Sequence, residues 1–314
     1  MDKNKKRVGV LRGGEYNYEN SLEKGSELIS YIFNNLSDNW QVADIFIDKN
    51  NIWHLAGQEI EPADLMHKVD VVWNVSYPSF SNVLQSFSIP TIGAELFSSF
   101  IGESRNLLEE HMKQIGVKMP RHFVIPVYQN DFDGPLDKYI FKKAKEVHEK
   151  FGAPWIVRPF SPDRNMGIHL AKTFPELLAA IEDGVNHNES ILIEEFIMGK
   201  NANMHSVLGF RENPSVQAGD VYVFPADSLY DNRQVFSKEE KEKLIYLVKN
   251  LHKHLTVKNY LNSWFVVHPK KRIYLTSIDF FPDLKENSHF NKSCESVGAK
   301  MNHVIEHILN KALN

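Results

Sequence analysis

The pattern of apolar and polar positions along roughly the first ninety residues predicts alternating strands and helices. Four short apolar runs have the length and composition of buried strands, at residues 7–11, 42–47, 70–75 and 89–93. Between the first two runs, residues 21–36 carry apolar side chains three and four positions apart, which predicts one face of an amphipathic helix. This alternation favours an α/β domain built on a parallel, doubly wound sheet.

The rest of the chain has an α+β texture, with short strands grouped between charged helices. Helices are predicted at residues 103–115, 138–151, 175–182, 238–254 and about 294–313. Strands are predicted at residues 122–125, 155–158, 167–171, 191–196, 202–210, 264–267 and 273–278, and near Tyr222. The change in texture predicts three parts: an N-terminal α/β domain (1–97), a central subdomain (98–185) and a C-terminal subdomain (186–314).

Composition and charge narrow the class of partner and the compartment. The 36 basic and 40 acidic residues give a formal charge of −4, so there is no electrostatic reason to expect nucleic acid or an anionic membrane. No apolar run approaches the length that spans a bilayer, and the basic residues 3–7 lead into a strand rather than a signal peptide. The single cysteine, Cys294, cannot form an internal disulfide. We therefore expect a cytoplasmic protein.

Seven short motifs occur in order along nearly the whole chain. They include the glycine turn VGVLRGG, the strand PWIVRP and the acidic strand end ILIEEFIMG. Their positions are residues 8–14 with 19–25, 90–93, 116–120, 154–159 with 166–168, 191–199, 224–226 and 273–282. Each motif alone is weak, but in this order they resemble the D-alanine–D-alanine ligase family of the ATP-grasp superfamily.

The resemblance implies a fold and a reaction. In that family ATP lies between two antiparallel sheets, a substrate carboxylate is phosphorylated, and an amine then displaces the phosphate. It therefore implies ATP and Mg²⁺ as cofactors, an amino-acid-like small molecule as substrate, a homodimer, and a role in peptidoglycan biosynthesis. Phosphoryl transfer depends mainly on positioning and charge neutralisation, so cations and oxygen ligands should surround the phosphates.

Arginines stand where the family has lysines near the phosphates. Arg105 begins a predicted helix, and Arg158 lies in the strand PWIVRP. Arginine keeps the positive charge and binds phosphate through two nitrogens. Arg158 also has a plainer alternative, as an ordinary ion-pair partner. Arg164, in the segment that replaces the family's phosphate loop, is a third candidate.

The resemblance also matches residues to adenine and to the substrate. Glu194, Glu195 and the backbone of Ile197 form the strand end that corresponds to the adenine-binding segment, although a solvated acidic strand end is the plainer alternative. Three candidates for the ends of a D-alanine-like substrate are matched by position: Glu19, Ser21 and Ser288.

The metal ligands are the largest departure from the family. Its three Mg²⁺-ligand positions hold Trp264, Ser277 and Asp279, which leaves one carboxylate. A divalent cation that bridges phosphates normally needs one or two carboxylates plus water, so we expect Asp279 to bind metal weakly.

Three functions therefore stay open at the level of sequence: a ligase of the family's usual type, a ligase for another acid or amine, and a non-catalytic descendant that binds a nucleotide or a partner. One other signal is discounted. His303 and His307 have metal-site spacing but no evident third ligand, which favours a solvated helix face.

Overall fold

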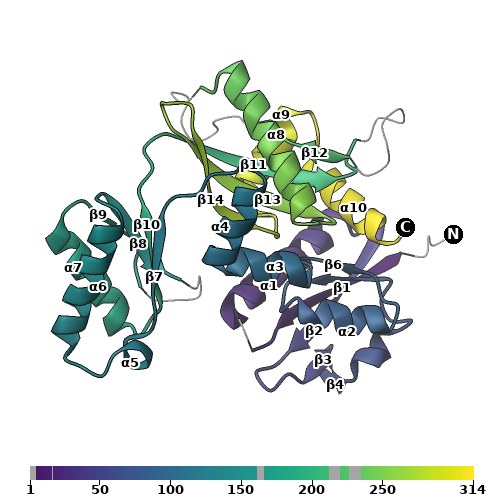
Figure 1. Ribbon diagram of the computed structural model, residues 1–314. Helices are drawn as coiled ribbons and strands as arrows, with labels where there is room; N and C mark the ends of the chain where they lie inside the picture. Colours follow the sequence, from purple (N-terminus) through teal and green to yellow (C-terminus); the bar gives the residue numbers. More distant parts are fainter. Residues whose placement is uncertain (1–4, 16, 161–165, 212–219, 226–234) are drawn as a thin grey trace. The chain divides into compact units, whose positions relative to one another are not determined.

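The computed structural model describes residues 5–15, 17–160, 166–211, 220–225 and 235–314, and these form two compact units. One unit combines Met1–Lys118 with Lys200–Asn314, and the other is Met119–Gly199 (Figure 1). The division of the chain into residues 1–97, 98–185 and 186–314 stays a prediction. Within the described residues, no helix is long and apolar enough to cross a membrane.

A six-stranded sheet forms the N-terminal part of the larger unit, in the order β4-β3-β2-β1-β5-β6. Its strands are β1 (Lys6–Gly13), β2 (Trp40–Ile47), β3 (Trp53–Leu55), β4 (Gln58–Ile60), β5 (Val71–Asn74) and β6 (Thr91–Ile92). The pairs β1–β2, β1–β5 and β5–β6 are parallel, as the alternating pattern predicts. The antiparallel β2–β3 and β3–β4 pairs are a difference from that prediction, because strands of three residues carry too short a pattern to be recognised.

The helices beside this sheet are α1 (Tyr18–Asn35), α2 (Ser79–Ser86), α3 (Leu96–Glu103) and α4 (Arg105–Gln114), with a short 3₁₀ helix at Pro62–Leu65. In α1 a buried stripe includes Gly25 and Leu28. A Cβ atom on Gly25 would lie 2.7 Å from the Cβ of Arg12, so glycine lets α1 lie directly on β1. The single helix predicted at 103–115 is wrong in its start, because α4 begins after Ser104, whose extended backbone and hydroxyl cap its N-terminus.

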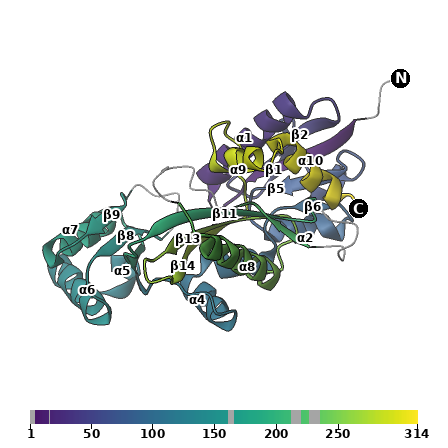
Figure 2. The same ribbon diagram turned by 90° about the horizontal axis from the view of Figure 1, so that it is seen from above.

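The second sheet of the larger unit is antiparallel, in the order β12-β11-β13-β14. Its strands are β11 (Lys200–Leu208), β12 (Val221–Val223), β13 (Tyr260–Val267) and β14 (Ile273–Asp279). Helix α8 (Lys238–His254) covers one face of this sheet (Figure 2). On that face, Ser206 of β11 contacts His252 of α8. The neighbouring His205 contacts His289 of α9 (His289–Ser296), and successive residues of a strand point to opposite faces, so α9 lies on the other face.

The chain ends with α10 (Met301–Ala312). The single helix predicted at 294–313 is therefore wrong: α9 and α10 are separate helices. They are interrupted at Gly298, which has φ +67° and donates its N–H to the carbonyl of Glu295 at 2.8 Å. This left-handed turn ends α9 in the way that glycine commonly ends helices.

One apolar core joins both sheets of the larger unit. Val8 of β1 and Leu28 of α1 pack in the same buried cluster as Phe290 of α9 and Ile305 of α10. Each of these side chains is completely buried. The first and last thirds of the chain therefore complete one another's core, which explains why they form a single unit.

The smaller unit has a four-stranded antiparallel sheet in the order β7-β10-β8-β9. Its elements are β7 (His122–Ile125), α5 (Tyr128–Asp131), α6 (Leu136–Lys150), β8 (Trp155–Pro159), β9 (His169–Ala171), α7 (Phe174–Asn186) and β10 (Ile191–Glu195). Helices α6 and α7 lie together beside the sheet (Figure 1). Tyr139, Trp155, Leu177 and Ile191 belong to its separate core.

Candidate functional site

The carboxyl ends of β1 and β5 and the start of α1 are held together by short hydrogen bonds. The Gly13 N–H donates to Ser21 Oγ at 3.0 Å, and the Ser76 hydroxyl donates to the Gly13 carbonyl at 2.6 Å. Ser21 is buried, so its hydroxyl fixes the turn between β1 and α1. Glu19, which precedes Ser21 on α1, is exposed. Of these two sequence candidates, only Glu19 presents its side chain to solvent.

A row of polar side chains crosses one face of the second sheet. In the strand register, His205 of β11 lies opposite Asn262 of β13, and Asn262 lies opposite Asp279 of β14. Side chains of directly paired residues share a face of the sheet. Asn262 is 4% exposed, and its Oδ1 accepts no hydrogen bond from the residues that the structure describes.

Asp279 is bound by a lysine that sequence reasoning missed. The Lys24 ammonium of α1 donates to both carboxylate oxygens, Oδ1 at 3.2 Å and Oδ2 at 3.0 Å. The same Oδ1 accepts the Phe281 N–H at 3.1 Å. A signal exists in the sequence: Lys24 lies three positions after Ser21 and four before Leu28, beside the packed stripe of α1. A charged side chain beside a buried stripe is expected to pair with an opposite charge on a neighbouring element.

Arg105 and Ser288 are buried and bonded within the larger unit. Arg105 is 7% exposed and donates to the Thr276 carbonyl of β14 at 2.9 Å. Ser288 is 4% exposed and caps α9, because its Oγ accepts the Asn291 N–H at 3.1 Å. Arg105, at the start of α4, therefore contacts β14 at Thr276, three residues before Asp279 on that strand.

A buried hydrogen-bonded chain runs beside the polar row. The Nδ1 of His205 bonds with the Tyr260 hydroxyl at 2.7 Å, and its Nε2 bonds with His289 Nδ1 at 2.8 Å. Burial, and then the neighbouring His289, hold the pKa of His205 well below its ordinary value. Burial is also the first cause that raises the pKa of Tyr260, followed by the charge of Asp279. The His205 and Tyr260 side chains are therefore neutral near pH 7.

The candidates of the smaller unit form two ion pairs at the ends of β8 and β10. Arg158 Nε donates to Glu194 Oε2 at 3.0 Å, and Glu194 is 7% exposed. Arg121 donates to both carboxylate oxygens of Glu195, at 2.9 and 3.0 Å. The hydrogen bonds from Arg121 are the first cause that lowers the pKa of Glu195. Ile197 follows the strand and is partly exposed.

The structure thus brings Arg158 and Glu194 into contact, while Glu195 has a partner of its own. Arg105 and Asp279 lie in the other compact unit. Arg164 lies outside the described residues. The roles of all these residues in binding a ligand remain predictions.

The residues present do not fit a divalent metal. Within the described residues, no group of three or more histidine, cysteine, aspartate or glutamate side chains is placed to hold one. Asp279 is engaged by Lys24, and the register places Trp264 opposite Ser277, neither of which offers a carboxylate. Mg²⁺ usually keeps one or two carboxylate ligands, so this donor set is too poor for it.

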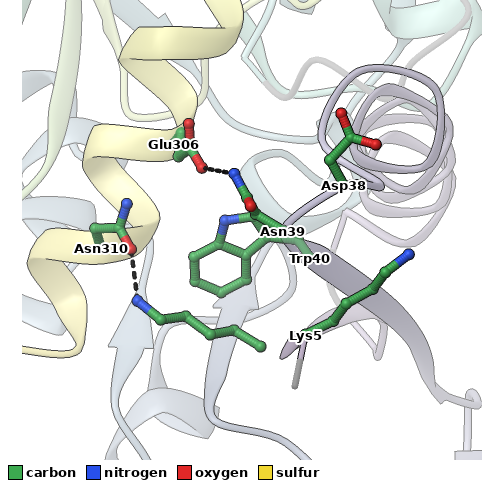
Figure 3. Close-up of a pocket in the computed structure, with 7 residues that line it drawn as sticks. Lys5, Asp38, Asn39, Trp40, Glu306 and Asn310 are labelled. Carbon is green, nitrogen blue, oxygen red and sulfur yellow. Dashed lines mark hydrogen bonds between the residues drawn. The ribbon is translucent and has the colours of Figure 1, made fainter. Parts of the chain in front are cut away.

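A separate cavity of about 270 Å³ lies at the amino ends of β1 and β2 (Figure 3). Its walls hydrogen-bond to one another: Asn39 donates to Glu306 at 2.8 Å, and Lys6 donates to Asn310 at 2.7 Å. Ligands of open α/β sheets bind at the carboxyl ends of the strands. We therefore place the candidate site at the Gly13 and Asp279 end rather than in this cavity.

A family model described as "D-ala D-ala ligase C-terminus" matches residues 113–310, well over half of the chain. The chain belongs to the D-alanine–D-alanine ligase family. This confirms the resemblance drawn from the seven motifs. The match extends through β7 to β14 and α10, and so includes both antiparallel sheets.

Individual relatives in this family are distant in sequence. A D-alanine–D-alanine ligase from Borrelia garinii is 23% identical over 360 residues, covering 98% of this chain and 96% of its own. The VanG D-Ala:D-Ser ligase structure from Enterococcus faecalis has a TM-score of 0.69 at 16% identity, covering 98% of this chain and 100% of that one. The Bacillus anthracis D-alanine–D-alanine ligase complexed with ATP has a TM-score of 0.66 at 18% identity, with 99% and 98% coverage. These likenesses confirm the predicted ATP-grasp fold class.

Proposed function

We propose that this chain binds ATP and uses it to join a carboxylate to an amine through an acyl phosphate. The observation that carries the proposal is the family match over residues 113–310. It is supported by a curated ligase of similar length that aligns with 98% of the chain. The solved relative from Bacillus anthracis, whose fold the chain shares, was complexed with ATP.

Arg158 is the residue we assign to the phosphates. Its side chain is 30% exposed, and its Nε is anchored by the nearly buried Glu194. A guanidinium fixed through Nε presents its two terminal nitrogens in a known direction, which suits bidentate binding of an anion. The ion-pair alternative and the phosphate role are therefore compatible, because Glu194 orients the group that binds.

The substrate candidates divide into a contacting residue and supporting residues. Glu19 is exposed beside the turn that ends β1, so it is suited to contact a substrate amine directly. The hydroxyls of Ser21 and Ser288 already hold backbone N–H groups of the turn and of α9. Within the proposal, these two serines position the walls of the site.

A second candidate function is nucleotide binding without ligation. The observation that favours it is the ion pair of Lys24 with Asp279, the one carboxylate among the three matched metal positions. In phosphoryl transfer, charge neutralisation supplies much of the rate, and removing one such electrostatic group costs roughly a hundred- to a thousand-fold. A protein of this kind keeps the fold and the nucleotide while its turnover falls.

Thermal-shift titration with ATP, followed by phosphate release across D- and L-amino acids, tests both candidates. Ligation predicts a melting shift with ATP and phosphate release that depends on one amino acid. Binding without ligation predicts the shift alone. If ATP produces no shift at millimolar concentration, both candidates are wrong.

A further inference from the structure

At the end of β14, the carboxylate of Asp279 is paired with the ammonium group of Lys24. Lys24 Nζ lies 3.0 and 3.2 Å from its two oxygens. The ammonium also lies 5.5 Å from the centre of the Phe281 ring, within the range of a cation–π contact. The Lys24 and Asp279 side chains are 27% and 35% exposed, so this pair is largely sheltered from solvent.

Two other carboxylates near this pair accept backbone hydrogen bonds of their own. Glu27, one turn along α1 from Lys24, accepts the Leu284 N–H at 2.7 Å. Asp283 is exposed and accepts the Lys285 N–H at 3.1 Å. On the sheet itself, the residue opposite Asp279 is the neutral Asn262. Asp279 is therefore in direct contact with Lys24, whereas Glu27 and Asp283 are bonded to backbone N–H groups.

From these contacts we infer that Lys24 takes the place of a divalent cation at Asp279, so that the site binds its ligand without metal. This inference rests on the proposed function, because it specifies how the nucleotide-binding site is neutralised. The ammonium takes both oxygens of the carboxylate, and the backbone N–H of Phe281 takes a third bond. A divalent cation would have to displace the lysine. It would then have a single carboxylate ligand, Asp279, which does not make a stable site.

The orientation of α1 makes this arrangement a built feature of the fold. Ser21, one turn before Lys24, is fixed by the Gly13 N–H, and Gly25, the next residue, packs against Arg12. The position of α1 on β1 is therefore determined on both sides of Lys24. Lys24 lies within α1 and Asp279 within β14, so their contact does not depend on the conformation of a loop.

A reversed charge at position 24 tests the inference without any nucleotide. Lys24→Glu places a second carboxylate beside Asp279, and Mn²⁺ is added while its free signal is followed by electron paramagnetic resonance. We expect the unmodified protein to bind no Mn²⁺ that depends on Asp279. The Lys24→Glu protein should bind one ion, and this site should disappear in the Lys24→Glu/Asp279→Asn control. The melting temperature of Lys24→Glu should fall by about 2–4 °C and recover with millimolar Mn²⁺.

Two outcomes of the Mn²⁺ experiment overturn the inference: Mn²⁺ binding by the unmodified protein that is lost in Asp279→Asn, or equal Mn²⁺ binding by Lys24→Glu and its control. If Lys24→Glu does not fold, Lys24→Gln removes the charge at similar length and should gain a weaker Asp279-dependent site. A last measurement separates this inference from the proposed function. An ATP-induced melting shift that is equal in Mg²⁺ and in EDTA supports the inference, and a shift that requires Mg²⁺ overturns it. The absence of a shift under both conditions overturns the proposed function instead.

Discussion

At the scale of single residues, two arginine–glutamate pairs lie on neighbouring strands but differ in their surroundings. Glu194 is nearly buried and binds Arg158, whereas the Arg121 side chain of the second pair is 58% exposed. Removing one partner of a buried pair leaves a desolvated charge, while exposed pairs contribute little. The two pairs therefore provide a matched comparison within one sheet.

We predict that Arg158→Ala destabilises the protein and removes the ATP-induced melting shift. The loss should be about 1–3 kcal/mol, because Glu194 loses a charged partner in a desolvated position. Urea denaturation measures the stability and thermal shift measures the binding. Arg121→Ala is the control, with an expected cost below about 1 kcal/mol and an unchanged shift. An ATP shift that survives Arg158→Ala would remove Arg158 from the proposed site.

At this scale the sequence located the charges but not their partners. Arg158, Glu194 and Asp279 could be selected from motif position alone. Lys24 matches no motif position, and although its place beside the packed stripe of α1 indicates an ion pair, its partner lies on β14, far away along the chain. The burial of Ser21 and Ser288 likewise follows from tertiary contacts rather than from the local pattern.

At the scale of elements, helix α8 is attached to its sheet through an uncharged histidine. His252 is completely buried, and its Nδ1 bonds with the Ser206 hydroxyl at 2.9 Å. Burial lowers the pKa of His252 to about 4. The folded protein therefore keeps this ring neutral at pH values where an unfolded chain protonates it.

We predict that stability falls as pH decreases from neutral toward 5. The unfolded chain binds a proton on His252 near pH 6.5, and the folded chain does so only near its lowered pKa. The contribution of this group should decrease by about 2 kcal/mol between pH 7.5 and pH 5. Urea denaturation across this range, compared with His252→Leu, measures it. A variant with the same pH slope as the unmodified protein would contradict the prediction, and the exposed His303→Gln serves as control.

The elements themselves were predicted well where periodicity is long and poorly where it is short. Strand β7 and helix α8 have the predicted bounds, because their patterns are uninterrupted. The breaks after Ser104 and at Gly298 were missed because apolar spacing continues across each turn. Such helix ends are determined by capping contacts. In a single sequence, a serine or glycine at such a position is common where no helix ends.

At the scale of the whole molecule, the two compact units differ in how their cores are assembled. Among the residues that the structure describes, the core of Met119–Gly199 contains only members of that segment. The core of the larger unit instead combines residues from both ends of the chain. Self-contained burial is what an independently folding domain requires.

We therefore predict that residues 119–199, produced alone, fold cooperatively. Their sheet and the helices α6 and α7 already bury Trp155 and Tyr139 without help from other segments. Circular dichroism and urea denaturation should show a single transition with native-like helix content. Trp155→Ala in the same fragment should lose about 3–5 kcal/mol and abolish that transition. A fragment that unfolds gradually, without a transition, would contradict the prediction.

The core shared by β1 and α10 has a consequence for synthesis in the cell. Val8 and Leu309 belong to the same cluster but lie about 300 positions apart along the chain, so Val8 leaves the ribosome long before Leu309. At usual translation rates the interval is roughly 15–60 s. Throughout that interval the first sheet exposes an apolar face that its own segment cannot cover. Nascent chains of this protein should therefore depend on chaperones more than a protein whose first domain closes by itself.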